Sequence, residues 1–157
     1  MDTIEKQRIH PLNDSDFCKG NYVLYWMQSS QRVHYNHALS CAGSIANKLD
    51  LPLLVFFGLT ENYPEANLRH FQFMLEGLAE TSQELKKKNI KMITWLIDPV
   101  EGVVNLAENA AAVLTDFGYL KISEDWIFRA AQEIKTKFFA VESNVIVPVR
   151  TASFKEE

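Results

Sequence analysis

Hydrophobic residues along this 157-residue chain alternate between two patterns, unbroken apolar runs and apolar residues spaced three or four apart. Unbroken runs are typical of strands that are covered on both faces of a sheet. They predict strands at Tyr22–Met27 and Leu51–Leu59, and two further strands are predicted at Lys91–Ile97 and Ala112–Asp116. A last strand with its exit is predicted over Phe139–Glu142 and Val145–Val149.

Four amphipathic helices are predicted between these strands, because apolar residues at i, i+3, i+4 and i+7 form one helical stripe. The first stripe consists of small residues: Ala38, Cys41, Ala42, Ile45, Ala46 and Leu49. The second helix spans about Leu68–Lys88, and its predicted inward positions are Phe71, Met74, Leu75, Leu78 and Leu85. Asp98, followed by Pro99, is predicted to cap the third helix. Ser123 is predicted to cap the fourth, whose stripe is Ile127, Ala130, Ala131, Ile134 and Phe138.

Strands that alternate with helices imply right-handed crossovers and a parallel sheet. We therefore predict a three-layer α/β/α sandwich, with a five-stranded parallel Rossmann-like sheet and Tyr22–Met27 at its centre. Residues 21–150 are predicted to form this domain, residues 1–20 an N-terminal tail, and residues 151–157 a tail or linker. Ligands of such sheets bind beyond the carboxyl ends of the strands, where the strand order reverses.

Charge and composition narrow the possible functions. The net charge of −4 gives no electrostatic footprint for DNA, which proteins bind through Lys and Arg. Cys18 and Cys41 lack metal-ligand spacing, which favours reduced thiols in a cytoplasmic protein. Residues 1–20 are polar and do not resemble a signal peptide. The longest apolar run, within Leu51–Leu59, is too short to span a membrane.

The turn at Met27–Arg32 is the most suggestive chemical feature. Backbone amides at a helix start, with the hydroxyls of Ser29 and Ser30, are able to hold an anion. The plainer interpretation, that one serine caps the following helix, is favoured about three to one. His34 and His37 have the spacing of metal ligands but no third partner, so no metal is predicted. We find no catalytic constellation in the sequence.

Three segments point to a known family: YVLYWM (Tyr22–Met27), LRHFQFMLEGL (Leu68–Leu78) and AVLTDF (Ala112–Phe117). In order and spacing they resemble the N-terminal α/β domain of class II DNA photolyases, over roughly Tyr22–Ser153. The resemblance implies the strand order 3-2-1-4-5, which places the switch point between the first and fourth strands. The cofactor-binding residues expected there are Trp26, Met27, Ser29, Ser30, Asp116, Phe117 and Gly118.

The resemblance also implies a function. Class II photolyases split cyclobutane pyrimidine dimers with light, using FAD in a helical C-terminal domain that we expect to be absent from these 157 residues. On this reading the chain serves as scaffold and antenna domain, with 8-hydroxy-5-deazaflavin as the possible chromophore. The expected partner is the FAD domain of the same polypeptide, and DNA is expected to bind through that domain. The chain alone is expected to be inactive. Trp26, Trp95 and Trp126 are then core aromatics.

The sequence departs from the family at polar positions, which indicates a diverged member. Gln28-Ser29-Ser30 stands where Ser-Arg-Asp is common, and Gly118–Lys121 replaces Ser-Pro-Leu-Arg. Two other functions stay open. One is a stand-alone nucleotide-binding or regulatory module of the universal stress protein type, although only Gly118 is available for its phosphate loop. The other is a purely structural interaction domain. Identification of a bound ligand separates the three.

Overall fold

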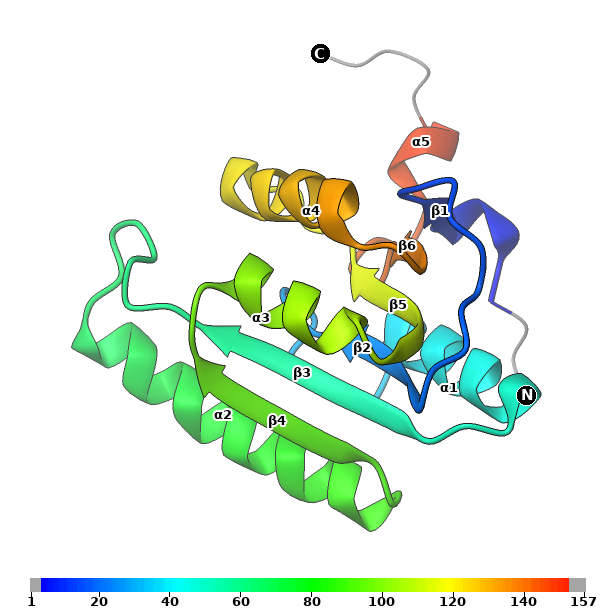
Figure 1. The fold of residues 1–157 in the computed structure, drawn as a ribbon. Coiled ribbons are helices and arrows are strands. Elements are labelled where there is room, and N and C mark those ends of the chain that lie inside the picture. Colours follow the sequence, from blue (N-terminus) through cyan, green and yellow to red (C-terminus); the bar gives the residue numbers. More distant parts are fainter. Residues whose placement is uncertain (1–3, 153–157) are drawn as a thin grey trace.

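The computed structural model describes residues 4–152 and consists of one six-stranded sheet with helices on both faces (Figure 1). The strands are β1 Ile9–Pro11, β2 Tyr22–Trp26, β3 Leu53–Leu59, β4 Lys91–Leu96, β5 Ala110–Asp116 and β6 Lys137–Val141. The helices are the 3-10 turn η1 Lys6–Arg8, α1 His37–Leu49, α2 Leu68–Lys87, α3 Pro99–Ala107, α4 Lys121–Glu133 and α5 Val149–Ala152.

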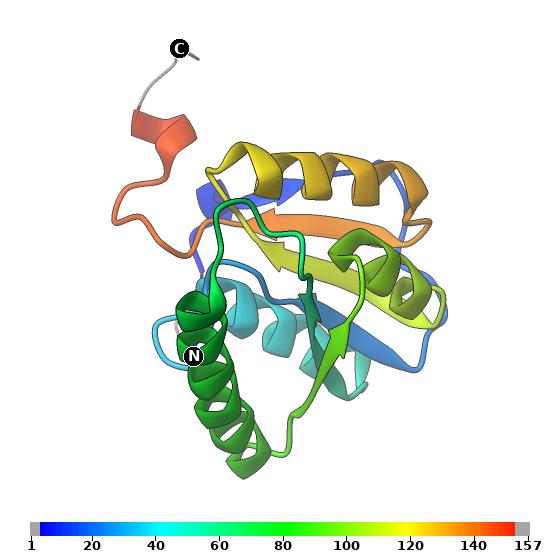
Figure 2. The same cartoon turned by 90° about the vertical axis from the view of Figure 1, so that its left-hand side faces the viewer.

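The sheet order is β1-β6-β5-β2-β3-β4, with β2 in the interior between β5 and β3. The helices α1 and α2 lie on one face, and α3 and α4 on the other, as Figures 1 and 2 show. Side chains of β2 alternate between these faces. Val23, Tyr25 and Met27 pack with α1 and α2, whereas Leu24 and Trp26 pack with α3 and α4. The predicted α/β sandwich with Tyr22–Met27 inside the sheet is therefore confirmed.

The prediction of a five-stranded, wholly parallel sheet of order 3-2-1-4-5 is not matched, because the sheet has a sixth strand at one edge. The short strand β1 pairs antiparallel with β6, with Ile9 opposite Val141. Residues of the predicted N-terminal tail thus belong to the fold from Ile4 onward. A strand of three residues is too short to show a hydrophobic periodicity in the sequence. β1 forms because it pairs with the edge of β6. Residues 153–157 of the predicted C-terminal tail lie outside the described residues.

Several local predictions also change. The last strand ends at Val141, residues 145–148 form a loop, and Val149 is already the first residue of α5. Leu75, predicted to face inward on α2, is 44% exposed, and Trp95, predicted to be a core residue, is 41% exposed. Trp95 belongs to β4, which is the edge strand of the sheet and has a neighbouring strand on one side only. Phe138 belongs to β6 and not to the α4 stripe.

Helix starts show which residues act as caps. Asp98 accepts hydrogen bonds from the backbone nitrogens of Val100 and Glu101, so its predicted cap of α3 is confirmed. The predicted serine cap of α1 is wrong, because Asn36 caps that helix by accepting from the nitrogen of Leu39. Ser123 lies inside α4, whose first turn has no side-chain cap. No helix within residues 4–152 is both long and apolar enough to cross a bilayer.

Candidate functional site

A buried carboxylate organises the turn after β2. Asp116, the last residue of β5, accepts hydrogen bonds from the backbone nitrogens of Gln28 (2.9 Å), Ser29 (2.6 Å) and Ser30 (2.9 Å). It also accepts one from the hydroxyl of Tyr25, at 2.9 Å. The amides that the sequence offered to a phosphate are therefore already bound by an internal anion. This also explains why the chain does not enter a helix at the serines.

The electrostatics of this carboxylate follow from its burial. Asp116 is completely buried, and desolvation raises its pKa, although the hydrogen bonds from Gln28, Tyr25, Ser30 and Ser29 act in the opposite direction. Burial, followed by the neighbouring Asp116, holds the pKa of Tyr25 well above its usual range. Tyr25 therefore stays a hydrogen-bond donor at neutral pH. The cluster is a rigid link between β2 and β5 and has no group poised to exchange a proton with a substrate.

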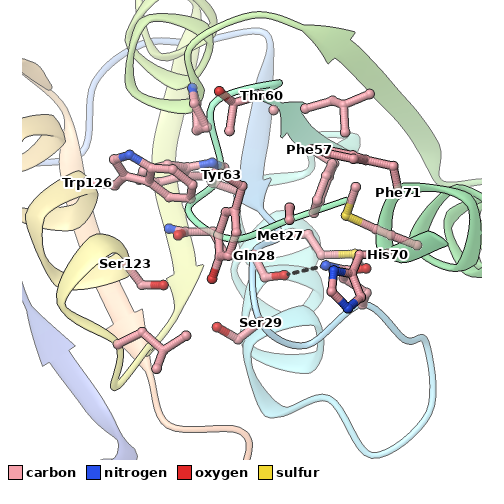
Figure 3. A pocket seen from close by; sticks show the side chains of 18 residues that line it. Met27, Gln28, Ser29, Phe57, Thr60, Tyr63, His70, Phe71, Ser123 and Trp126 are labelled. Carbon is pink, nitrogen blue, oxygen red and sulfur yellow. Dashed lines mark hydrogen bonds between the residues drawn. The ribbon is translucent and has the colours of Figure 1, made fainter. Parts of the chain in front are cut away.

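Beside this turn lies a cavity of about 350 Å³, at the carboxyl ends of β2 and β3. Its walls come from the loop after β3 and from the first turns of α2 and α4. Figure 3 shows Tyr63 and Trp126 on one side, His70 and Phe71 on the other, and Gln28 and Ser29 between them. The lining residues are Trp26, Met27, Gln28, Ser29, Gln31, Phe57, Gly58, Leu59, Thr60, Tyr63, Ala66, His70, Phe71, Met74, Pro99, Leu120, Ser123 and Trp126.

The cavity wall is aromatic and uncharged. The rings of Tyr63 and Trp126 meet edge-on, with centroids 6.1 Å apart. His70 is engaged elsewhere, since its Nδ1 accepts from the backbone nitrogen of Asn67 in the capping box of α2. The wall contains no Asp, Glu, Lys or Arg. Such a cavity suits a neutral, planar molecule and offers no acid–base machinery.

The predicted site residues divide into two groups. Trp26, Met27 and Ser29 line the cavity, and Ser30, Asp116, Phe117 and Gly118 do not. Ser30 is fully buried and its hydroxyl contacts the amide oxygen of Asn144. Phe117 packs away from the cavity, where its ring meets that of Tyr119 at 5.3 Å.

Gly118 lies outside the cavity wall but allows two residues of that wall to approach each other. A Cβ atom built on Gly118 would lie only 2.5 Å from the Cβ of Ser123 and 3.4 Å from the Oγ of Ser29. Its missing side chain thus allows the first turn of α4 to approach the turn after β2. Ser123 and Ser29 both line the cavity. Gly118 and Asp116 therefore set the positions of residues in the cavity wall without belonging to it.

Sequence reasoning missed the half of the cavity that comes from β3 and α2, including Phe57, Tyr63 and Phe71. The prediction placed the site at the ends of the first and fourth strands only. A usable signal was present, because the motif Leu68–Leu78 places Phe71 and Met74 at the start of α2. These residues come beside the end of β3, and β3 is the direct neighbour of β2.

The basic residues near α1 have structural partners. Arg32 donates to the carbonyl oxygens of Tyr35 (3.1 Å) and Ser143 (3.2 Å), so it anchors two loops. Arg8 donates to the carbonyl oxygen of Val145, at 2.8 Å. Burial, followed by the charge of Arg8, lowers the pKa of His37. Among residues 4–152 no three His, Cys, Asp or Glu side chains are grouped so as to hold a metal ion.

Fold and cavity together define a doubly wound α/β domain with a pocket at the carboxyl edge of its sheet. Residues 23–157 match the family model described as DNA photolyase. A deoxyribodipyrimidine photo-lyase of Methanothermobacter thermautotrophicus is 45% identical over 155 residues, which cover 98% of this chain and 35% of that protein. One of Potorous tridactylus is 33% identical over 138 residues, 85% of this chain and 26% of that protein. The chain belongs to the DNA photolyase family.

The chain spans about a third or less of the length of these relatives. Among solved structures, an archaeal photolyase of Sulfolobus tokodaii that holds two FAD molecules has a TM-score of 0.67 at 17% identity, covering 85% of this chain and 32% of its own. A universal stress protein of Archaeoglobus fulgidus with dAMP has a TM-score of 0.53 at 12% identity, covering 80% of this chain and all of its own. At these identities the likeness concerns the fold alone.

Proposed function

We propose that this chain is the α/β domain of a photolyase of the class II type, and that its cavity holds a planar antenna chromophore of the 8-hydroxy-5-deazaflavin class. The observation that carries the proposal is an uncharged cavity with Tyr63, Phe71 and Trp126 in its wall, in a chain of the DNA photolyase family. An antenna passes excitation through space. Its host therefore needs a rigid aromatic pocket and no catalytic group.

The proposed role rests on the charge of the chain and on the share of its relatives that the chain spans. Light-driven repair of cyclobutane pyrimidine dimers, the FAD on which it occurs, and contact with DNA are assigned to the part of the relatives that this chain does not span. The net charge of −4 supports this assignment, because affinity for DNA rests on basic residues that meet phosphates. The FAD-binding domain is the proposed partner, in cis.

We further propose that the protein is a diverged member. Of the three residues Gln28-Ser29-Ser30 that replace the common Ser-Arg-Asp, Gln28 and Ser29 line the cavity. The departure thus falls where a ligand would be contacted, directly after Trp26 and Met27, which belong to the kept family pattern. A changed chromophore, or a changed way of holding it, is the expected consequence.

A nucleotide-binding module of the universal stress protein type is the second candidate, and the fold likeness to the Archaeoglobus fulgidus protein is its support. Two features weigh against it. The loop after β5 offers Gly118 as its single glycine. The backbone amides at the turn after β2 are bound by Asp116, whose negative charge would oppose a phosphate at that position.

The test is a fluorescence titration of the chain with 8-hydroxy-5-deazaflavin and, separately, with ATP. Ala66 lines the cavity, so Ala66→Trp is expected to fill it and abolish binding of the deazaflavin. Ala79 lies in α2, the helix that follows Ala66, and it is exposed and does not line the cavity. Ala79→Trp is therefore the matched control and should bind like wild type. Saturable binding that Ala66→Trp leaves unchanged would place the site elsewhere, and no binding of either compound would favour a structural module.

A further inference from the structure

Two buried polar atoms stand out because nothing pairs with them. Across the described residues 4–152, the buried side-chain nitrogen and oxygen atoms without a hydrogen-bond partner are Nε1 of Trp26 and Oε1 of Gln28. Trp26 is fully buried, Gln28 is 8% exposed, and both residues line the cavity. A buried donor or acceptor without a partner is costly and rare in folded proteins. Because both atoms belong to residues that line one cavity, they point to a partner inside it.

The orientation of the Gln28 amide follows from the hydroxyl of Thr115. This hydroxyl donates to the carbonyl oxygen of Trp26, at 3.0 Å. Its lone pair is then free to accept from Nε2 of Gln28, at 3.1 Å. The amide nitrogen is thus held by Thr115, and the oxygen is the end that lacks a partner. One donor and one acceptor thus belong to two residues that line the same cavity and lie two apart in the sequence.

We propose that Trp26 and Gln28 bind the polar edge of a planar heterocycle in this cavity. The indole Nε1–H of Trp26 donates to a ring acceptor, and Oε1 of Gln28 accepts from a neighbouring ring N–H. The inference rests on the proposed function, in which the ring is a deazaflavin: its pyrimidinedione part presents an imide N–H between two carbonyl oxygens. Adenine also presents an acceptor beside an N–H donor, so the test must separate these two sources of the same chemistry.

The first arm changes the ligand and leaves the protein intact. The 157-residue chain is titrated with 8-hydroxy-5-deazaflavin, with its derivative methylated at the imide nitrogen, and with AMP. Methylation removes the N–H that Gln28 would accept from and leaves that oxygen unpaired. We expect the methylated compound to bind roughly tenfold or more weakly. Because no residue is replaced, a failure to fold does not affect this arm.

The second arm changes the donor. Trp26→Phe keeps an aromatic ring and removes the Nε1–H, and it is expected to weaken deazaflavin binding by a similar factor. Trp95→Phe is the matched control, because Trp95 does not line the cavity; it should bind like wild type. In a ¹H–¹⁵N spectrum, the indole signal that is lost in Trp26→Phe should move downfield when wild type binds the deazaflavin.

The outcomes separate this inference from the proposed function. Equal binding of the deazaflavin and its methylated derivative, with an unmoved Trp26 signal, would overturn the inference and leave the antenna function standing; the two atoms would then be paired by ordered water. Binding of AMP alone, weakened by Trp26→Phe, would keep the edge recognition and overturn the antenna function. Binding of none of the compounds would overturn both.

Discussion

The carboxylate of Asp116 lies 2.6 Å from the backbone nitrogen of Ser29, which joins the end of β5 to the turn after β2. The same carboxylate accepts from Tyr25, whose hydroxyl in turn accepts from the side chain of Asn36, at 3.0 Å. Asn36 caps α1. One buried anion thus fixes the turn that lines the cavity, the strand beneath it and, through Tyr25, the start of the next helix.

We predict that Asp116→Asn destabilises the domain and weakens binding in the cavity. An amide nitrogen in place of one carboxylate oxygen would face the N–H groups of Gln28 or Ser29, which leaves buried donors unpaired. The expected loss in the free energy of unfolding is about 2 kcal/mol or more. It is measured by urea denaturation, alongside a deazaflavin titration.

Asp125→Asn is the control for this variant. Asp125 is exposed on α4, and its carboxylate contacts Arg129 at 3.8 Å, one helical turn away. Such exposed pairs contribute little, so the change in stability should stay within about 0.5 kcal/mol. Equal effects of the two substitutions would mean that Asp116 does not hold the turn.

Much of the sheet was predictable because its signals are local. The unbroken apolar runs of β2 and β3 indicate strands that are buried on both faces, and Asp98 followed by Pro99 indicates the start of α3. The start of α1 was not predictable in this way. Ser29 and Ser30 look like caps, but their amides are bound by Asp116, which lies more than eighty residues further along the chain.

The cavity was predictable only in part, for a similar reason. Trp26, Met27 and Ser29 follow from the rule that ligands lie at the carboxyl ends of central strands. Tyr63 comes from a loop and Trp126 from α4, and their edge-on contact is created by the fold. The unpaired atoms of Trp26 and Gln28 are likewise invisible in a sequence, because they are defined by the partners that the surrounding structure does not supply.

Two glycine substitutions are predicted to change the free energy of unfolding in opposite directions. At Gly118 an added Cβ would lie 2.5 Å from the Cβ of Ser123, so Gly118→Ala must push α4 away from the turn after β2. We expect a loss of about 1–3 kcal/mol in stability, together with weaker deazaflavin binding, since Ser123 and Trp126 would move with α4. Differential scanning calorimetry and the titration measure the two effects.

Gly43→Ala is the companion variant. Gly43 lies within α1, and a Cβ built on it has no atom within 4 Å. Alanine in a helix interior is favoured over glycine by about 0.5–1 kcal/mol, so this variant should be more stable than wild type and bind equally well. If both substitutions changed the stability in the same direction, the close approach of Gly118 to Ser123 would not limit the stability of the domain.

The chain alone is predicted neither to hold FAD nor to repair dimers. In the proposed function the repair chemistry belongs to the part of the relatives that the chain does not span, and the cavity beside the turn after β2 has no Asp, Glu, Lys or Arg in its wall. The purified chain is illuminated with DNA that contains cyclobutane dimers, and restored pyrimidines are measured. The Methanothermobacter thermautotrophicus photo-lyase is the positive control. Flavin absorbance together with light-dependent repair by the isolated chain would refute the prediction.

The last prediction concerns Glu142, which joins both ends of the described chain to the sheet. Its buried carboxylate lies 2.7 Å from Nε2 of His10 in β1 and accepts from Tyr119 (3.0 Å) and from the backbone nitrogen of Val149 (2.8 Å). Desolvation acts to raise the pKa of this carboxyl, but the bonds from Val149, His10 and Tyr119 outweigh it, so the pKa is lowered. Burial, with the bond to Glu142, raises the pKa of Tyr119 to about 12, which keeps it a donor.

A lowered pKa in the folded state means that the unfolded chain binds the proton more readily. Stability from Glu142 is therefore fully present above the ordinary value of 4.5 and is lost as the pH falls through the folded-state pKa. Glu142→Gln should be less stable by about 1–3 kcal/mol at pH 7 and should lose less stability than wild type on acidification below about pH 4.5. Glu133→Gln, at an exposed position of α4, should keep the wild-type pH profile. Urea denaturation at a series of pH values compares the three proteins, and parallel profiles for wild type and Glu142→Gln would show that this carboxylate does not link pH to folding.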